Sequence, residues 1–494
     1  MRTAILAFAA LSALHAQFGL FHHDKYFQPV HRLSGIGAER KDVSDAVLEK
    51  RTELMTDSQT FSIMRDSHAL EGAQRITSSK LQKIFDSAAK ESGLPANLIA
   101  AVAYLESWGD ATAQSSAGPK GIMQFSGATA KRTGLQIVYA TRYRTMQTTR
   151  RVKVRGKMVN RKVATKVPYQ VLVRDDRLLP ERAIPAAAKY LASLEAKFGG
   201  RDLAVFAYHC GEGCVSDFIQ LAHQVSGLRD HPVTVPRLFF SANPAHYREI
   251  YERIKYHMGR DYSPTYYFRV MRAQQLLDLY RTDPDAFRTL VEQYRNSGDP
   301  TRRAATRLSA WIKPQDLQYH SCEDLKREEG KSLARVLDKP DFFGFQLRTS
   351  GTGAIGSWDL KNQNYYLQAS PSAIGTLTYI AFETRKLFDE LKPKGEKFMP
   401  LEVTALVRPL DFQEKAGVGE LPVHCTGQVF DLAFDFLPPH EKECLNFILE
   451  DMGCNGYLGF AEESAGSMHV GCSPSSRDFF LKVYEETLDQ KHAS

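Results

Sequence analysis

The chain has 494 residues, of which 43% are hydrophobic and 24% are charged, and its formal net charge is +7. This composition excludes a mainly disordered protein, and the length predicts two or three domains rather than one core. The charge is unevenly distributed, because 13 Lys or Arg residues and no Asp or Glu lie between Lys131 and Arg174. The basic character is therefore local and needs a local explanation.

The first residues, "MRTAILAFAALSALHAQ", predict a secretory signal over residues 1–16. Arg2 supplies the positive start, residues 4–14 are mostly apolar, and cleavage is expected after Ala16. The apolar run is too short to span a membrane easily. We therefore expect an exported mature chain, periplasmic or extracellular, without a transmembrane span. Seven cysteines suit such an oxidising compartment, and their odd number leaves at least one unpaired within the chain.

Residues 17–75 are predicted to be an arm or linker, and residues 76–285 to be all-helical apart from one insertion. Helical runs end at glycines, and "SPTYYFRVMRAQQLLDLY" predicts a helix with Ser263 as its N-cap and Pro264 as its first residue. The insertion is the basic segment. "RRVKVRGKMVNRKVATKVPYQVLV" alternates apolar and polar residues around a turn at "RGK", which predicts a β-hairpin.

Residues 286–335 are charged and predicted to be a helical linker. Residues 336–494 mix strand-like runs, including "NYYLQA", "LEVTALVRPL", "QVFDLAFDF" and "SMHVGC", with two helical runs. The predicted fold is thus a multidomain α+β protein: an all-α domain with a basic hairpin, followed by a smaller α+β domain. "GTGAIG" at Gly351 fits a dinucleotide-binding pattern, but no helical sequence follows it, so we interpret it as a turn.

Glu106 ends an apolar helical run, and a loop of small residues follows it in "LIAAVAYLESWGDATAQSSAGPKGIMQFSGATA". A carboxyl close to Trp108 and covered by the loop at Ala117 and Gly118 would lose solvation. Desolvation raises a carboxyl pKa and keeps the group protonated, as a general acid requires. A single glutamate of this kind is more often structural than catalytic, so the surrounding residues decide between the two interpretations.

The ordered blocks around Glu106 resemble the soluble lytic transglycosylase family, which has a lysozyme-like fold. "SGLPANLIAAVAYLES", "GIMQ", "ERAIPAAAKYLASL", "AYHCGEGCV" and "SPTYYFRV" occur in the order that the family shows, across residues 76–285. The resemblance implies that Glu106 is the single catalytic acid and base. It implies substrate-binding roles for six further residues: Ser115, Gly121, Met123, Gln124, Tyr208 and Tyr266.

The chemistry that the resemblance implies uses one carboxyl twice. Glu106 would protonate the oxygen between N-acetylmuramic acid and N-acetylglucosamine, and would then take the proton of the C6 hydroxyl as a 1,6-anhydro ring closes. No cofactor and no second carboxylate are needed, unlike in ordinary glycoside hydrolysis. Asp110 is interpreted as a turn residue. Two alternatives remain, a lysozyme-type murein hydrolase and a cell-wall-binding protein without activity.

The segment "AYHCGEGCV" departs from the family because His209 and Glu212 replace its usual Asn and Pro. It also carries two cysteines four residues apart across a glycine-containing turn. We predict that Cys210 and Cys214 form a disulfide, because two cysteines on one straight helix would pair less easily. The basic hairpin has two equal interpretations, a polyanion contact and a solvated hairpin; its few aromatic residues disfavour nucleic acid.

The C-terminal residues contain candidate zinc ligands. His424 and Asp431 are seven residues apart, and His469 lies on a later predicted strand, a donor set that suits zinc with one open position. Residues 370–475 resemble the M15-like zinc D-Ala-D-Ala peptidase superfamily. The resemblance implies a substrate-facing Arg408, a nearby polar Gln413, and stem peptides as partners beside the glycan strands.

The expected catalytic base of that superfamily is absent, because Gly466 occupies the position three residues before His469. The site is therefore predicted to bind zinc without cleaving peptides, or to use another base. Cys425 and Cys472 flank two of the candidate ligands. They either form a disulfide, or Cys425 is buried and inert.

Overall fold

The computed structural model describes residues 45–64, 66–258, 260–261, 263–295, 319–415, 423–454, 457–462 and 466–493. The predicted signal segment and residues 296–318 of the predicted linker 286–335 lie outside these residues. The chain divides into a small unit, His68–Tyr208 with Ala273–Arg288, and a large unit, Met1–Ser67 with His209–Arg272 and Thr289–Ser494. In this division residues 209–272 group with the C-terminal part of the chain.

The small unit is a group of helices around the apolar helix α5. Six residues of α5 in succession, Ile99 to Tyr104, are fully buried, and α5 contacts α3, α4 and α7. Three of its helices, α8, α13 and α14, have residues in both units. Its elements are α3 (Ala69–Ile76), α4 (Ser79–Ser92), α5 (Ala96–Ser107), α6 (Gly127–Arg132), η2 (Asp176–Leu178), α7 (Pro180–Phe198), α8 (Arg201–Cys210), α13 (Tyr266–Thr282) and α14 (Pro284–Arg295).

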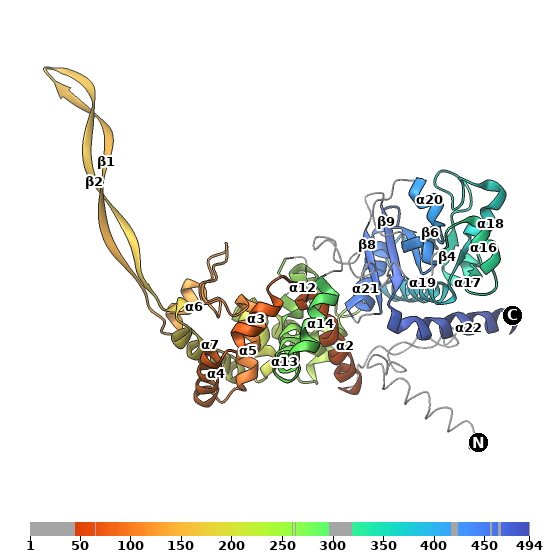
Figure 1. Cartoon of the computed structure of the whole chain (residues 1–494), viewed down its shortest axis with the longest axis horizontal. Helices are drawn as coiled ribbons and strands as arrows, with labels where there is room; N and C mark the ends of the chain where they lie inside the picture. The colour runs from red at the N-terminus through yellow and green to blue at the C-terminus, as the bar shows by residue number, and fades with distance from the viewer. Residues whose placement is uncertain are drawn as a thin grey trace. The chain divides into compact units, whose positions relative to one another are not determined.

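The basic segment forms a long antiparallel hairpin of β1 (Ile137–Val154) and β2 (Lys157–Asp175), which extends away from α6 and α7 (Figure 1). Arg155 and Gly156 join the strands, and both have positive φ, the backbone of a two-residue type I′ turn. At the other end Asp176 accepts a hydrogen bond from the Gln136 N–H at 3.0 Å. This contact fixes the base of the hairpin to η2.

The large unit combines one helix near the start of the chain and several helices from its middle with a C-terminal α+β part. The helices are α2 (Asp45–Met64), α9 (Glu212–Gln224), α10 (Ser226–Arg229), α11 (Val235–Ser241), α12 (Arg248–Met258) and η3 (Ser263–Thr265). The C-terminal part comprises α16 (Cys322–Glu328), β3 (Ala334–Arg335), α17 (Pro340–Phe343), β4 (Phe345–Leu347), η4 (Leu360–Asn362), α18 (Gln363–Tyr366), β5 (Gln368–Ala369), α19 (Pro371–Leu391), β6 (Leu401–Ala405), α20 (Leu410–Lys415), η5 (Val423–Thr426), β7 (Val429–Ala433), α21 (Pro439–Cys454), β8 (Leu458–Glu462), β9 (Ser467–Cys472), η6 (Pro474–Ser476) and α22 (Arg477–Ala493).

The main sheet of this part has the strand order β4-β6-β7-β9-β8, with β4 and β6 parallel and the other pairs antiparallel. Every residue of the central strand β7 is buried. Helix α19 contacts β7, β9, α21 and α22, and most of its residues are buried. Gly375 permits the closest of these approaches, since a Cβ there would lie 1.9 Å from the Phe480 carbonyl oxygen.

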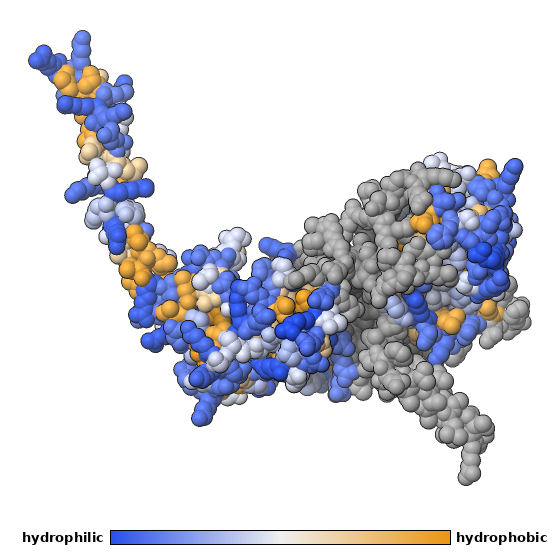
Figure 2. Space-filling model, viewed as in Figure 1, coloured by the Kyte–Doolittle hydropathy of each residue, from blue (hydrophilic) through white to orange (hydrophobic). Residues whose placement is uncertain are grey.

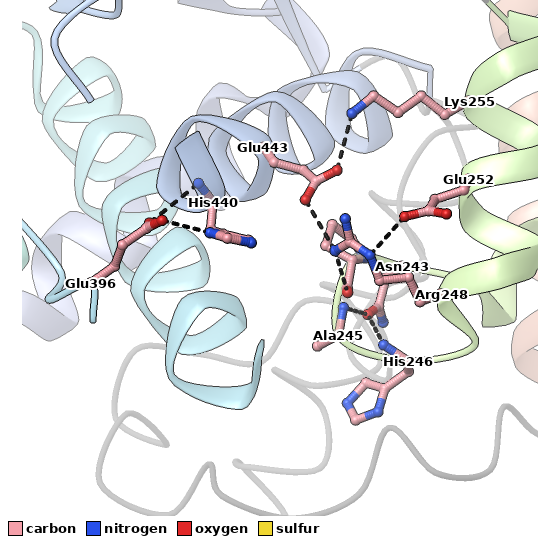
Figure 3. A network of polar contacts seen from close by, with 10 residues as sticks. Asn243, Ala245, His246, Arg248, Glu252, Lys255, Glu396, His440 and Glu443 are labelled. Carbon is pink, nitrogen blue, oxygen red and sulfur yellow. Dashed lines mark hydrogen bonds and ion pairs between the residues drawn. The ribbon is translucent and has the colours of Figure 1, made fainter. Parts of the chain in front are cut away.

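Ion pairs join the middle helices of the large unit to its C-terminal part (Figure 3). Glu443 of α21 lies 3.0 Å from Lys255 and 3.1 Å from Arg248, both on α12. Beside them the rings of Tyr251 and Phe447 meet edge to face at 5.7 Å, and α2 contributes a buried pair between Arg51 and Asp451. These contacts explain why α2 and α12 belong to the large unit despite their distance from α21 in sequence.

The structure corrects three details of the predicted elements. "NYYLQA" is half helix and half strand, since α18 ends at Tyr366 before the two-residue β5. Ser263 does not cap α13, because residues Ser263–Thr265 form η3 and α13 begins at Tyr266. The sequence prediction also missed the edge strand β8 and the last helix, α22. No helix among the described residues is both long and apolar enough to cross a membrane.

Candidate active site and metal centre

Glu106 lies at the end of α5, where the chain reverses direction. Trp108 and Gly109 both have positive φ, and the Trp108 N–H bonds to the Tyr104 carbonyl at 2.8 Å, which ends the helix. The Ser107 hydroxyl donates to the Ile122 carbonyl at 2.8 Å. This bond ties the helix end to the returning loop, so the backbone that carries the half-buried Glu106 is fixed on both sides.

The Trp108 side chain packs against Tyr104 and α3. Its ring meets Tyr104 edge to face at 4.7 Å, and Gly72 of α3 lies against it. Residues two apart on a helix do not face each other, so Glu106 lies on a different face of α5 from Tyr104. Trp108 therefore belongs to the α3–α5 contact, and no contact with Glu106 follows from it.

The loop after Glu106 is held largely by backbone contacts. Gly121 has φ +78°, and a Cβ on it would lie 1.8 Å from the Arg177 carbonyl oxygen. Gln124 also has positive φ, and its side-chain amide donates to the carbonyls of Gly121 at 2.9 Å and Ala113 at 3.3 Å. The residues of "GIMQ" thus shape a tight turn directly beneath η2.

A buried ion pair that the sequence analysis missed supports this turn. The Arg177 guanidinium lies 2.6 Å from the Asp175 carboxylate and also donates to the Phe125 carbonyl at 3.2 Å. The hydrogen bonds from Arg177 lower the pKa of Asp175 despite its burial. The only sequence signal was an "RDDR" run at the end of the hairpin, which does not distinguish a buried pair from surface charges.

Tyr208 of α8 lies close enough to Glu106 to interact with its charge. Its hydroxyl donates to the Met123 carbonyl at 2.8 Å, and its ring lies near those of Phe125 and Tyr190. Burial raises the pKa of Tyr208 well above its usual range, and the negative charge of Glu106 raises it further. The phenol therefore stays neutral while it remains close to the carboxylate.

The other predicted substrate-binding residues occupy different environments. Met123 is fully buried, so its side chain belongs to the core, and its carbonyl accepts the hydrogen bond from Tyr208. Ser115 is exposed in the loop, where its hydroxyl accepts a bond from the Ala117 N–H at 3.2 Å. Tyr266 belongs to the large unit, where its buried ring stacks on His209 at 4.3 Å.

Asp110, the next carboxylate after Glu106, is a turn residue in the structure. It accepts hydrogen bonds from the Thr112 N–H and hydroxyl, both at 2.8 Å. Burial acts to raise the pKa of Asp110, but the two bonds from Thr112 lower it overall. Asp110 is thus held as an ionised turn carboxylate, which does not suit a proton donor.

The predicted disulfide is confirmed. Cys210 ends α8, Gly211 has φ +91° and separates the two helices, and Cys214 follows in α9, with Cα atoms 5.9 Å apart. The alternative disulfide between Cys425 and Cys472 is not formed, and both thiols are buried. Burial raises the pKa of Cys425 to about 11, which supports the expectation that this thiol is inert.

The three predicted metal ligands come together in the large unit. His424 lies in η5, Asp431 on β7 and His469 opposite Asp431 on β9, and candidate ligand atoms of the three lie within 4.8 Å of one another. The Asp431 carboxylate is 2.6 Å from His469 Nδ1 and 3.2 Å from His424 Nε2. Residues 45 positions apart in sequence are therefore joined by one strand pair and one short turn.

The surroundings prepare His424 to donate a lone pair. Its Nδ1 lies 2.9 Å from the Leu406 carbonyl, which leaves Nε2 as the unprotonated nitrogen toward Asp431. Burial lowers the pKa of His424 to about 4, so the imidazole is neutral at pH 7. Within the described residues the buried Nε2 has no hydrogen-bond partner, a condition that a metal ion would relieve. The donor set therefore fits a divalent metal of the zinc type.

Arg408 borders this cluster, and Gly466 precedes His469 by three residues in the sequence. An Arg408 nitrogen lies 3.7 Å from the second Asp431 oxygen, and Gln413 is on α20, although its side chain lies outside the described residues. Gly466 has φ +73°, and a Cβ on it would lie 2.2 Å from an Asp435 carboxylate oxygen. Asp435 thus fills the space that a side chain at position 466 would need.

Comparison with known proteins identifies the class of the first site. Residues 83–227 match the family model described as "Transglycosylase SLT domain", so this segment is a lysozyme-like SLT domain and the resemblance is confirmed for it. The residues of the second site lie outside that match, and their resemblance to M15-like peptidases remains a prediction.

Two curated relatives match over limited lengths. "Peptidoglycan transglycosylase gp16" of Escherichia phage T7 is 39% identical over 131 residues, which are 26% of this chain and 8% of that protein. "Membrane-bound lytic murein transglycosylase F 2" of Alkalilimnicola ehrlichii is 25% identical over 223 residues, 44% of this chain and 40% of that protein. The chain therefore spans less than half of either relative.

Proposed function

We propose that this protein is a peptidoglycan lytic transglycosylase that cleaves the bond between N-acetylmuramic acid and N-acetylglucosamine and leaves a 1,6-anhydro end. The observation that carries the proposal is the placement of Glu106. It stands at a fixed helix end beside Tyr208, in a segment that matches the SLT domain. The names of the two relatives point to the same reaction.

In the proposed mechanism Glu106 acts first as the acid and then as the base. It donates its proton to the glycosidic oxygen, an oxocarbenium-like state forms, and the resulting carboxylate takes the proton of the C6 hydroxyl as that oxygen closes the ring. Tyr208 stays neutral and next to Glu106, where its position depends on the bond to the Met123 carbonyl. Gly121 and Gln124 shape the turn that we propose as the floor of the saccharide site.

Replacement of Glu106 tests this mechanism. We expect Glu106→Gln to lower the rate of cleavage of purified sacculi by about 10³-fold, the scale of a lost general acid. Mass spectrometry of wild-type products should show anhydro ends. Asp110→Asn is the matched control and should retain most activity, because Asp110 serves a turn. Reducing ends instead of anhydro ends would identify a hydrolase, and a wild-type rate in Glu106→Gln would exclude this assignment of the site.

We also propose that the chain is exported to the compartment that holds its substrate. The disulfide between Cys210 and Cys214 supports this location, because such bonds persist in oxidising compartments. The signal-like residues 1–16 support it independently. Fractionation of cells that express the full chain, with detection of the processed N-terminus, checks both points.

The cluster in the large unit supports a second proposed function, zinc-dependent binding of murein stem peptides. His424, Asp431 and His469 would hold the ion, which would supply a Lewis acid next to Arg408. A peptide carboxylate would suit Arg408, whose nearest described anion is Asp431 at 3.7 Å. Peptide cleavage is disfavoured, because Gly466 offers no base.

Metal analysis of the full-length protein tests the zinc proposal. We expect about one equivalent of zinc in the wild type and a 10–100-fold or greater loss of affinity in His424→Ala. His440→Ala is the matched control, because His440 pairs with Glu396 elsewhere in the unit. Less than half an equivalent in the wild type would exclude the site. Full zinc without release of D-Ala from stem peptides would indicate a binding role.

A further inference from the structure

The hairpin β1–β2 is a two-stranded sheet with no third strand among the described residues. Its strands have 18 and 19 residues, so it spans roughly 60 Å at about 3.3 Å per residue. Most of its side chains are exposed, and hydrophilic and hydrophobic residues mix along its length (Figure 2). Isolated two-stranded hairpins are marginally stable in water, so this one has little stabilisation from packing.

The positive charges of the hairpin have no negative residues beside them in its sequence between Lys131 and Arg174. All charged residues between Lys131 and Arg174 are cations. Arg150 and Arg161 are directly opposite each other in the register, and like charges in such a pair destabilise a sheet. An anionic surface would remove this repulsion, because each cation would then face a negative group.

Apolar side chains interrupt the cations near the turn. Val152 pairs with Val159 across the strands, and Val154, Met158 and Val159 are exposed by 44%, 57% and 42%. These residues surround the Arg155–Gly156 turn and alternate with Lys153 and Lys157. The end of the hairpin is thus both cationic and apolar, a combination suited to the interface of a lipid bilayer.

We propose that the end of this hairpin binds the surface of an anionic lipid bilayer. Lys and Arg side chains contact lipid phosphates, while Val154, Met158 and Val159 enter the boundary between headgroups and acyl chains. A soluble polyanion would use the cations but would leave the apolar residues in water. Nucleic acid is disfavoured because the tyrosines of the strands, Tyr139, Tyr143 and Tyr169, lie away from the turn, which has no aromatic residue for stacking bases.

Vesicle flotation with the full-length protein tests this surface independently of glycan cleavage. We expect binding to vesicles of phosphatidylcholine with phosphatidylglycerol, weak binding to phosphatidylcholine alone, and a decrease with rising salt. Arg150→Gln, Lys153→Gln and Arg161→Gln together should weaken binding about 100-fold, since each cation near an anionic surface contributes a factor of about five. The matched control Lys80→Gln, Lys83→Gln and Lys90→Gln, on exposed positions of α4, should bind like the wild type.

A second variant separates a bilayer from other polyanions. Val154→Ser, Met158→Ser and Val159→Ser together should weaken vesicle binding about tenfold or more and leave binding to soluble polyphosphate unchanged. Wild-type vesicle binding by either hairpin variant would overturn the proposal. Tight binding to polyphosphate or to an oligonucleotide, without binding to anionic vesicles, would also overturn it. Circular dichroism of each variant monitors the helical fold, to which these exposed side chains do not contribute.

Discussion

The two candidate sites of this protein are built in different ways. Around Glu106 the contacts that fix the geometry end on backbone carbonyls, those of Ile122, Met123 and Gly121 among them. Around Asp431 the central contacts join side chains, with both histidines against one carboxylate, and His424 is also held by the Leu406 carbonyl. A site held by the backbone depends on the path of the chain, whereas a site held by side chains depends on which groups are present. Substitutions beside the two sites should therefore differ in effect.

Loss of the Arg177 guanidinium should have the largest effect on stability. Arg177→Met leaves the buried Asp175 carboxylate without its partner, and breaking a buried pair from one side costs about 3–5 kcal/mol. The free energy of unfolding from urea titration measures this loss. Because the pair lowers the pKa of Asp175, its stabilisation is present above the unfolded pKa near 3.8 and is lost as the pH falls through the folded value.

The double variant Asp175→Asn with Arg177→Met separates the pair from its surroundings. It should recover part of the stability lost in Arg177→Met, because no buried charge is then left unpaired. Equal stability of Arg177→Met and the wild type would show that the turn under Glu106 does not depend on this pair.

Gly121→Ala should be the next most damaging change. The new methyl group would meet the Arg177 carbonyl, a backbone atom that cannot rotate away, at a residue with positive φ. Strain of about 1–2 kcal/mol from the backbone and 1–3 from overpacking predicts a loss of about 3 kcal/mol. Cleavage of sacculi should fall as well, because the turn that carries Gln124 would shift. Full activity with lowered stability would separate the turn from the substrate site.

Gly466→Ala should be the mildest of these substitutions. Its φ is also positive, but the atom in the way is a carboxylate oxygen of Asp435, a half-exposed side chain that can move. We expect a loss of about 1 kcal/mol, from the backbone alone. Zinc content should stay at the wild-type level. A loss as large as that of Gly121→Ala would contradict the contrast between backbone and side-chain construction.

The sequence was sufficient for the parts of the molecule that depend on local pattern. Apolar periodicity located α5, α7, α19 and α21, and alternation located the strands that carry Asp431 and His469. The edge strand β8 was missed because "LGFAE" is short, although Asn455 and Gly456 before it form a turn signal in the sequence. Whether a strand forms there depends on pairing with β9, which only the tertiary structure supplies.

The residues of the candidate sites could be predicted from the sequence, but the side chains that pack around them could be predicted less well. Glu106, Tyr208 and the three candidate ligands follow from ordered motifs, and the structure brings them together as two groups. The contacts of Trp108 with Tyr104 and Gly72 were not predicted, because they depend on how α5 packs against α3. Asp175 and Arg177 were missed because the charged run "RDDR" does not show which of its side chains are buried. Their burial, which makes them a structural ion pair, is seen only in the tertiary structure.

The ion pairs between α12 and α21 bear on how such a gene can be divided or recombined. A truncation after residue 295 would keep the whole segment matched to the SLT domain, yet Arg248 and Lys255 would lose Glu443, and Tyr251 would lose Phe447. Transfer of the C-terminal part to another protein would expose the same surface from the other side. A stable fragment of the large unit must therefore contain both α12 and α21, although nearly two hundred residues of sequence separate Lys255 from Glu443.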